Sequence, residues 1–313
     1  STFRDHSRWG VYAKDIDQFL IENNTFEDNQ DGGLWILNGG VGSVRGNTAA
    51  NNNDPISNQG LGLDIGSHSG AVVENNIAYG HKQQGIEIFG AVTAQNNTAY
   101  DNRIGLRMIG RHGLLLDNTA YNNEYGFSGE SSIYGIGTIE GNTAYGNSTA
   151  GIWGNDSTII RGNTVYDNAL GVRSAYLVAN NLIRDNTGIA VSLPSLNSRD
   201  RIPELRNNTI ISNGDNAVVL SGDTRDVIVE NNIFDITDAT AVVVGTDNTE
   251  NFQSDYNLYQ LQGSASLADW VGLIIDDLTD WFYVAGQGGH SLTADPMFID
   301  PANDDYHLQS GSP

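Results

Sequence analysis

The sequence has 313 residues but no cysteine, and its 15 lysine and arginine residues stand against 38 aspartate and glutamate residues. The absence of cysteine excludes a disulfide framework and thiol chemistry. A net charge of −23 argues against nucleic acid and anionic membranes as partners, since both need clustered basic side chains. No segment reaches the ~18 apolar residues of a membrane span, so we expect no membrane insertion. Such an acidic surface keeps a long chain soluble and attracts divalent cations.

What the chain does contain is a repeat. Segments such as ENNTF, RGNTA, QNNTA and EGNTA recur at intervals of 18 to 29 residues. A period of this length, built from short β-branched runs and Asn/Gly corners, is typical of a parallel β-helix. Crossovers between parallel strands are almost always right-handed, so we expect a right-handed helix. The recurring asparagines are Asn24, Asn47, Asn76, Asn97, Asn118, Asn142, Asn163, Asn181, Asn208 and Asn232.

Each turn of the repeat predicts stacked columns of like side chains. Identical asparagines at the ~4.8 Å strand spacing can hydrogen-bond from turn to turn, which satisfies amides that would be costly to bury alone. Tyrosine recurs on five successive turns, from Tyr79 to Tyr166. A second asparagine ladder follows the first by five residues: Asn29, Asn52, Asn102, Asn123, Asn147, Asn168, Asn186 and Asn213.

The repeat predicts an all-β domain of about 10–11 turns over residues 1–250. Residues 251–313 break the pattern and carry Trp270, Trp281, Phe282 and Tyr283. We expect this tail to cap the last turn, because an open solenoid end exposes strand edges. The chain begins within the repeat, so we expect a monomer or a fragment of a larger multidomain protein.

A glycine opens one strand in most turns, as in Gly62-Leu-Asp-Ile and Gly85-Ile-Glu-Ile. The aliphatic residues of each triplet point into the core, so the residue between them points outward. Followed from turn to turn, this outward position reads Tyr12, Trp35, Asp64, Glu87, Arg107, Ser128, Trp153, Arg173 and Ala190.

Asp64 and Glu87 are therefore predicted to lie side by side, an arrangement that is unfavourable for two like charges. A bound cation such as calcium, a shared proton, or the neighbouring Arg107 can each hold them there. The last of these is an ordinary surface ion pair, and the first two are functional states. All three explanations stay open.

Further residues around this cluster point to a ligand site. The longest connection in the first turns, within AANNNDPISNQG (49–60), leads directly to Asp64, and such insertions tend to line a binding face. His81 interrupts the second ladder beside Lys82. Aromatic side chains on either side of polar groups suit a sugar chain. We therefore predict that substrate is bound by Tyr12, Trp35, His81, Lys82, Trp153 and Arg173.

The repeat G-[I/L/V]-x-[I/L]…N-x-T-A-Y-x-N resembles that of bacterial exported right-handed β-helix proteins, including pectate and alginate lyases and mannuronan epimerases. The tail, with SDYNLY (254–259) and AGQGGHSLTADPMFIDPANDDYHLQSGSP (285–313), resembles the closing segment of such proteins. In pectate-lyase-like enzymes an arginine removes the proton α to the uronate carboxyl, while calcium on acidic residues neutralises that carboxyl. The resemblance implies Arg107 as the base, with Asp64 and Glu87 as catalytic and calcium-binding residues. The D-P-H-E motif of mannuronan epimerases and the paired-Asp and R-I-K signatures of polygalacturonases are missing.

The first functional hypothesis is a secreted or cell-surface bacterial protein that acts on polysaccharide, as a lyase on an acidic, uronate-containing glycan. The alternative is a non-catalytic glycan-binding or adhesion module whose charged column is only an ion pair. A glycoside hydrolase, since paired carboxylates ~5 Å apart match retaining enzymes, or a polyuronate epimerase are further alternatives.

Overall fold

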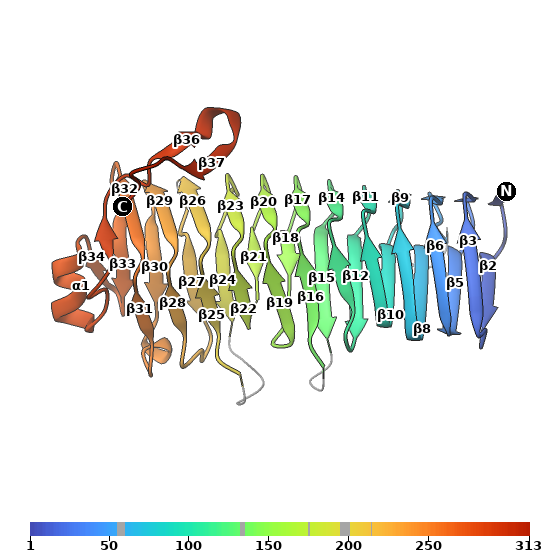
Figure 1. The fold of residues 1–313 in the computed structure, drawn as a ribbon, viewed down its shortest axis with the longest axis horizontal. Helices are drawn as coiled ribbons and strands as arrows, with labels where there is room; N and C mark the ends of the chain where they lie inside the picture. Colours follow the sequence, from blue (N-terminus) through green and yellow to red (C-terminus); the bar gives the residue numbers. More distant parts are fainter. Residues whose placement is uncertain (55–59, 132–134, 175, 195–200, 214) are drawn as a thin grey trace.

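A computed structural model shows three strands per turn, stacked turn upon turn into a parallel β-helix that is elongated along the stacking axis (Figure 1). It describes the chain except residues 55–59, 132–134, 175, 195–200 and 214. The predicted all-β fold class is confirmed. One column forms a sheet of thirteen strands: β1 (Thr2–Arg4), β4 (Thr25–Glu27), β7 (Thr48–Ala50), β9 (Ile77–Tyr79), β11 (Thr98–Tyr100), β14 (Thr119–Tyr121), β17 (Thr143–Tyr145), β20 (Thr164–Tyr166), β23 (Leu182–Arg184), β26 (Thr209–Asn213), β29 (Ile233–Thr237), β32 (Leu258–Gln262) and β35 (Leu292–Thr293).

The second column carries the glycine-led strands. Its members are β2 (Trp9–Lys14), β5 (Gly32–Gly39), β8 (Leu61–Glu74), β10 (Gln84–Gln95), β12 (Ile104–Gly110), β15 (Tyr125–Ser131), β18 (Ala150–Trp153), β21 (Val172–Arg173), β24 (Val191–Pro194), β27 (Val218–Ser221), β30 (Thr240–Val244) and β33 (Ser266–Trp270).

The third column precedes the asparagine corner, and the long strands β8 and β10 run through the bend into it. Its other members are β3 (Gln18–Glu22), β6 (Val41–Arg45), β13 (Leu114–Leu116), β16 (Gly137–Glu140), β19 (Thr158–Arg161), β22 (Leu177–Ala179), β25 (Glu204–Arg206), β28 (Ile228–Glu230) and β31 (Gln253–Asp255).

The predicted asparagine ladders are present as continuous hydrogen-bond chains. Asn118 is representative: its Nδ2 donates to Ala94 O (2.9 Å) and to Asn142 Oδ1 (3.0 Å), and its Oδ1 accepts from Asn97 N and Nδ2 (both 2.9 Å). The first ladder extends one rung further than expected, to Asn257. The second ends at Asn186, because Asn213 lies at the end of β26 with its side chain in solvent.

The residue before each ladder asparagine explains the recurring NN, GN and DN pairs. Asn75 and Asn96 have φ of 55° and 54°, and Gly46 and Gly141 have φ of 60° and 67°. Glycine and, less readily, asparagine and aspartate tolerate this left-handed conformation. The pair therefore turns the corner and places the second residue's amide in the ladder.

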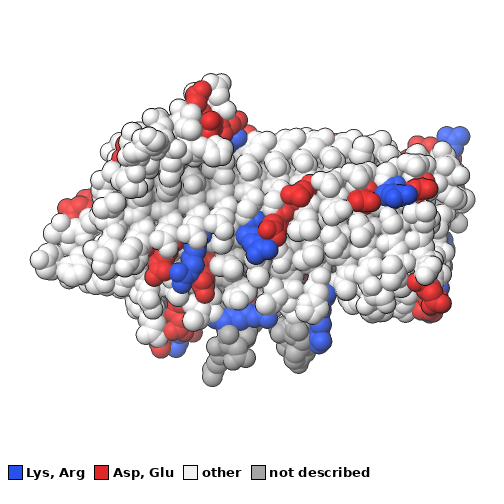
Figure 2. All heavy atoms as spheres, in the orientation of Figure 1, with Lys and Arg blue, Asp and Glu red and all other residues white. Residues whose placement is uncertain are grey.

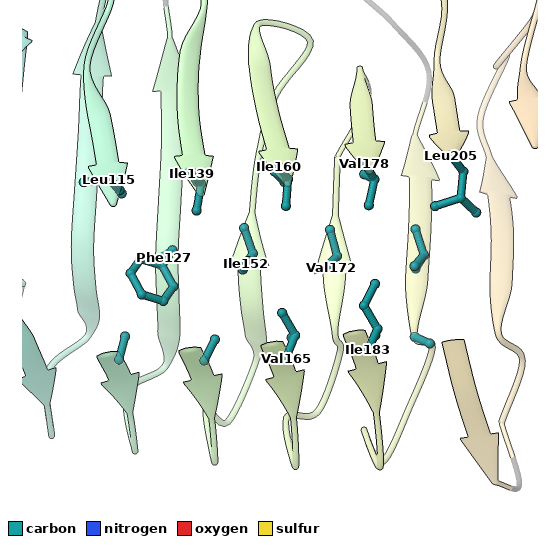
Figure 3. Close-up of a cluster of buried hydrophobic side chains, with 14 of the residues drawn as sticks. Leu115, Phe127, Ile139, Ile152, Ile160, Val165, Val172, Val178, Ile183 and Leu205 are labelled. Atoms are coloured by element: carbon teal, nitrogen blue, oxygen red, sulfur yellow. The ribbon is translucent and has the colours of Figure 1, made fainter. Parts of the chain in front are cut away.

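The core consists of aliphatic side chains stacked in register from turn to turn. Figure 3 shows one such row, and adjacent members are direct strand partners with no exposed surface. The row contains Leu115, Ile139, Ile160, Val178 and Leu205. Because each residue needs to match only its neighbours along the stack, the core lengthens by repetition.

The C-terminal end of the stack is covered by the tail. Parallel pairing continues past residue 250, where we expected the repeat to end, as far as β33 in the second column and β35 in the first. Strand β34 (Leu273–Ile275) then pairs antiparallel with β33 and leads into helix α1 (Leu278–Ala285). The fully buried Trp281 packs edge-on against Trp270 at 5.5 Å. The remaining elements are η1 (Thr246–Asn248), β36 (Phe298–Asp300), η2 (Pro301–Asn303) and β37 (Asp305–Leu308).

The tail motifs singled out in the sequence serve this closure. Asn257 N, at the end of the first ladder, donates to Ser291 Oγ at 3.1 Å. His290 stacks on Tyr256 at 4.7 Å, and its Nδ1 lies 2.7 Å from Asp255 Oδ2. The D-Y-N and H-S segments therefore join the last turn to the chain that closes it.

Candidate functional site

The predicted outward column is present on the second strand column for most of its length. Strand pairing aligns Trp35 with Asp64, Asp64 with Glu87 and Glu87 with Arg107. Beyond Ser128 the register continues with Trp153, Arg173 and Ser192. Ala190 was wrongly placed in this column: it is buried, because Val191 rather than Ile189 is the strand partner of Val172.

A charged row forms the centre of the column, where Arg107 lies between Glu87 and Glu130. Arg107 Nη1 lies 3.0 Å from Glu87 Oε2, and Arg107 Nη2 lies 2.5 Å from Glu130 Oε2. Both Arg107 and Glu87 are largely buried, with side chains 24% and 15% exposed. Glu130 was not predicted from the sequence, although it lies two residues after Ser128 in β15 and so on the same face.

Asp64 has a different environment from Glu87. No hydrogen-bond donor contacts its carboxyl among the described residues, and burial together with the charge of Glu87 raises its pKa to about 7, against a smaller opposing effect of Arg107. Burial also raises the pKa of Glu87, but Arg107 opposes that rise through its charge and its hydrogen bond. The neighbouring carboxyls thus have unlike environments, and Asp64, with a pKa of about 7, can exchange a proton near neutral pH.

The role of base predicted for Arg107 does not fit these contacts. Burial alone would lower the pKa of Arg107, but its hydrogen bonds and ion pairs with Glu130 and Glu87 outweigh that effect and raise the pKa. A guanidinium held between two carboxylates stays protonated and cannot accept a proton. Arg107 can orient the acidic groups and donate to a ligand.

A shallow pocket of about 260 Å³ opens beside this charged row. In the column the small Ser128 lies between two large side chains, Arg107 and Trp153, and leaves the space that the pocket occupies. The pocket is smaller than the ~300–1,000 Å³ typical of sites that enclose a drug-sized ligand. The pocket therefore suits one part of a longer ligand. Its lining residues are Gln84, Arg103, Ile104, Arg107, Tyr125, Ser128, Glu130 and Trp153.

Aromatic side chains lie at both ends of the charged row. At the N-terminal end, Trp35 packs against Tyr12 at 4.8 Å and against Trp9 at 5.3 Å, and these rings line a second depression of about 280 Å³ with Arg8. At the other end, Trp153 meets Tyr125 edge-on at 5.4 Å. Trp9 was missed in the sequence, although it opens the strand that carries Tyr12.

His81 and Lys82 do not join the column. His81 is buried in the second ladder, where its Nδ1 accepts from Asn52 N at 3.1 Å, and burial lowers its pKa to about 4. The prediction that His81 binds substrate is therefore wrong: the neutral ring replaces a ladder amide. Lys82 Nζ donates to Asp54 O at 2.6 Å. The rest of the inserted loop, residues 55–59, lies outside the described part of the chain.

The donor set does not fit calcium. Calcium takes six to eight oxygen ligands, whereas the described residues contain no group of three histidine, aspartate or glutamate side chains placed to hold a metal. Asp64 and Glu87 supply two carboxylates, and Arg107 places a positive charge against the second.

Charged side chains elsewhere form small groups of both signs. Figure 2 shows red and blue atoms beside each other on one face of the stack, with most of that face white. The column of Glu22, Arg45 and Glu74 is one such group in register, with Arg45 and Glu22 paired at 2.8 Å. Such exposed pairs contribute little to stability.

Comparison with known proteins agrees with this architecture. The family model for the right-handed β-helix region matches residues 1–127 and 89–234, most of the chain. The chain belongs to the right-handed β-helix family. Membership confirms both the predicted fold class and its predicted hand.

This β-helix chain has a distant relative among curated proteins. It is 27% identical to "Uncharacterized protein YwoF" of Bacillus subtilis (strain 168) over 331 aligned positions, which cover 94% of this chain and 58% of that protein. The chain thus spans less than two thirds of that relative. Among the helices of the described part, none has the length and apolar character needed to cross a bilayer.

Two solved β-helix structures show the same fold. The Dettilon tailspike protein (gp208) superposes with a TM-score of 0.54 at 14% identity, covering 92% of this chain and 62% of that one. The mannuronan C-5 epimerase AlgE4 A-module of Azotobacter vinelandii gives 0.53 at 14% identity, covering 94% and 81%. At this identity the likeness concerns the fold and does not assign a reaction.

Proposed function

We propose that this chain is a secreted β-helix protein that binds polysaccharide along the outward column. The carboxyl groups of Asp64 and Glu87 would cleave the bound polysaccharide. The observation that carries the proposal is the pair of neighbouring carboxyls in unlike environments. One has a pKa of about 7, and the other is paired with an arginine. Environments that separate the protonation of two neighbouring carboxyls are typical of acid–base catalysis.

The reaction that suits this pair best is glycoside hydrolysis. Neighbouring strands lie ~4.8 Å apart, close to the ~5–5.5 Å between the carboxyls of retaining glycosidases. In this proposal protonated Asp64 donates its proton to the glycosidic oxygen, and ionised Glu87 attacks the anomeric carbon. Water then releases the sugar from Glu87 and returns a proton to Asp64.

Flanking aromatic residues support a sugar polymer as the ligand. Trp35 lies one turn from Asp64, and Trp153 lies two turns from Arg107. Aromatic faces stack on sugar rings, and polar groups between them bind hydroxyls. The AlgE4 A-module, which shares the fold, is named as a mannuronan C-5 epimerase, which adds a fold-level analogy to the proposal.

Elimination by a lyase is the second candidate, favoured by the guanidinium groups at the site. In a uronate-containing glycan Arg107 would face the sugar carboxylate, and Asp64, not Arg107, would accept the α-proton. The two reactions need opposite forms of Asp64. Hydrolysis requires its acid and slows as the pH rises through about 7, whereas elimination requires its base and accelerates over the same range.

The test is incubation with a panel of neutral and uronate-containing polysaccharides. Reducing ends report any cleavage, and ultraviolet absorbance of an unsaturated product reports elimination. We expect Asp64→Asn and Glu87→Gln to lower kcat/KM by about 100-fold or more. Glu140→Gln is the matched control, since Glu140 is also paired with an arginine, Arg161, at 2.8 Å but lies in the third column. A chelator should leave the rate unchanged.

The same polysaccharide panel distinguishes an enzyme from a non-catalytic glycan-binding module. Binding without cleavage, unchanged by either variant, would replace the proposal with a non-catalytic glycan-binding module. Absence of binding to every glycan would remove polysaccharide as the ligand altogether.

A further inference from the structure

Arg173 differs from the other arginines whose side chains the structure describes on the strands of the stack. Arg45 and Arg161 each pair with a glutamate on the neighbouring turn at 2.8 Å. Arg173 forms neither an ion pair nor a hydrogen bond through its guanidinium to any described residue, and its ring contact with Trp153 is the interaction that holds it. In a chain with a net charge of −23, an unpaired cation on the ligand-binding column calls for an explanation.

Its position is fixed by the strand register. Arg173 is the strand partner of Trp153, and its Cζ lies 4.3 Å from the centroid of the indole ring. On the other side the column continues with Ser192, a side chain too small to cover the guanidinium. The cation–π contact orients the group, and its N–H donors have no acceptor among the described residues.

The electrostatic state of Arg173 favours an anionic ligand. Burial lowers the pKa of Arg173, opposed in part by Tyr125. A guanidinium that has lost water without gaining a carboxylate is stabilised when an anion supplies the missing partner. A planar carboxylate matches the guanidinium with two parallel hydrogen bonds.

We propose that Arg173, held on Trp153, is a subsite for the carboxylate of a uronic acid residue in a bound polysaccharide. The inference rests on the proposed function and adds the substrate class, an acidic glycan. From Glu87 the column passes Arg107, Ser128 and Trp153 before it reaches Arg173. At ~4.8 Å per turn the subsite lies ~19 Å from Glu87, so it binds a sugar remote from the cleaved bond and acts on affinity.

The test is titration calorimetry with oligosaccharides of a polyuronate and with the same oligosaccharides after reduction of their carboxyls. Arg173→Gln removes the charge and keeps most of the stem. We expect it to weaken binding of the acidic ligand about tenfold, which corresponds to ~1.4 kcal/mol, and to leave the reduced ligand unaffected. Arg173→Lys keeps the charge without the planar fork and should recover only part of the loss.

Arg161→Gln is the matched control, because it removes the same charge from strand β19 of the third column and should change neither affinity. A sulfated neutral glycan is titrated as a further ligand. If Arg173→Gln weakens its binding as much as that of the polyuronate, the assignment to carboxylate is overturned. Equal loss of the acidic and reduced ligands would also overturn the subsite, since Arg173 would then only support Trp153.

Failure of the subsite and failure of the proposed function give different results. If the unaltered protein binds polyuronate but Arg173→Gln leaves that affinity unchanged, the subsite is wrong and polysaccharide binding stands. If the unaltered protein binds neither ligand, and a Ser128→Phe variant that fills the pocket behaves identically, the proposed function fails and the subsite fails with it.

Discussion

At the scale of single residues, the same amide side chain is structural at one position and indifferent at another. Asn118 is 1% exposed, and its side chain takes part in four hydrogen bonds along the ladder. Asn213 occupies the position at which the second ladder was predicted to continue, at the end of β26, but its side chain faces solvent. The side chain of Asn213 leaves the ladder because β26 runs on to Asn213 itself. In the turn before, β23 ends at Arg184, two residues before the ladder residue Asn186.

Replacing Asn118 by alanine should therefore lower the free energy of unfolding by about 1–3 kcal/mol, because Asn97 N, Ala94 O and the amide of Asn142 lose partners in the interior. The measurement is denaturant unfolding followed by far-ultraviolet circular dichroism. Asn213→Ala is the control, expected to change stability by less than ~0.5 kcal/mol. Equal effects of the two substitutions would show that the ladder does not stabilise the fold.

Asp64 gives stability a pH dependence of definite sign. Its pKa rises from 3.8 to about 7 on folding, so folding favours the protonated form. The contribution of Asp64 to the free energy of unfolding is complete below pH ~4 and is lost as the pH rises to ~7. We expect the Asp64→Asn variant to lack this pH-dependent loss. At pH 8 its free energy of unfolding should exceed that of the unaltered protein by about 2 kcal/mol, a value reduced to allow for the partial exposure of Asp64.

The check is the difference in unfolding free energy between Asp64→Asn and the unaltered protein from pH 4 to pH 8. Asp167→Asn, at an exposed corner, should give a flat difference. A flat difference for Asp64→Asn as well would mean that Asp64 is solvated, which would remove the basis for its proposed catalytic role.

At the scale of elements, the half-buried tyrosine column and the cap show which sequence features stabilise the stack. Tyr100 stacks between Tyr79 and Tyr121 at 4.9 and 5.0 Å with nearly parallel rings. Its faces are thus covered by other tyrosines and are not available to a sugar. Arg184 closes the column by lying over Tyr166 at 4.4 Å.

The cap depends on one side chain. Trp281 of α1 has no exposed surface and contacts Trp270 and Phe252 at the open end of the last turn. Trp281→Ala should lower the unfolding free energy by about 3–5 kcal/mol, the usual cost of removing a buried aromatic. Phe282→Ala, on the exposed side of the same helix, is the control and should cost less than ~1 kcal/mol. Comparable losses would mean that α1 covers the stack loosely.

At the scale of the whole molecule, the repeat made the architecture and the central register predictable, because every turn restates the same pattern. Asp64, Glu87 and Arg107 could be aligned from their glycine-led triplets alone. The alignment failed at Ala190, where the strand begins later relative to its glycine. The burial of His81 and the partners of Arg107 depend on contacts between turns, which one turn's sequence does not contain.

The stack also predicts a gradient of local stability. In a solenoid each turn contacts only its neighbours, so stability is approximately a sum over turns and interfaces. The apolar residues of the first turn, such as Phe3, Val11 and Phe19, are only partly buried. Leu34 in the second turn is fully buried, and Trp281 covers the last.

Amide hydrogen exchange should consequently be fastest in β1–β3, slow in the middle turns, and slow again at β33 under the cap. Mass spectrometry of peptic fragments measures this profile directly. Trp281→Ala provides the internal control: it should accelerate exchange in β31 and β33 and leave β2 and β3 unchanged, because coupling between turns decays along the stack. Uniform exchange in the unaltered protein, or acceleration of all turns by Trp281→Ala, would show that the β-helix opens as one cooperative unit. In that case the carboxyl pair at Asp64 and Glu87 would share the stability of the whole molecule and not that of its own turns.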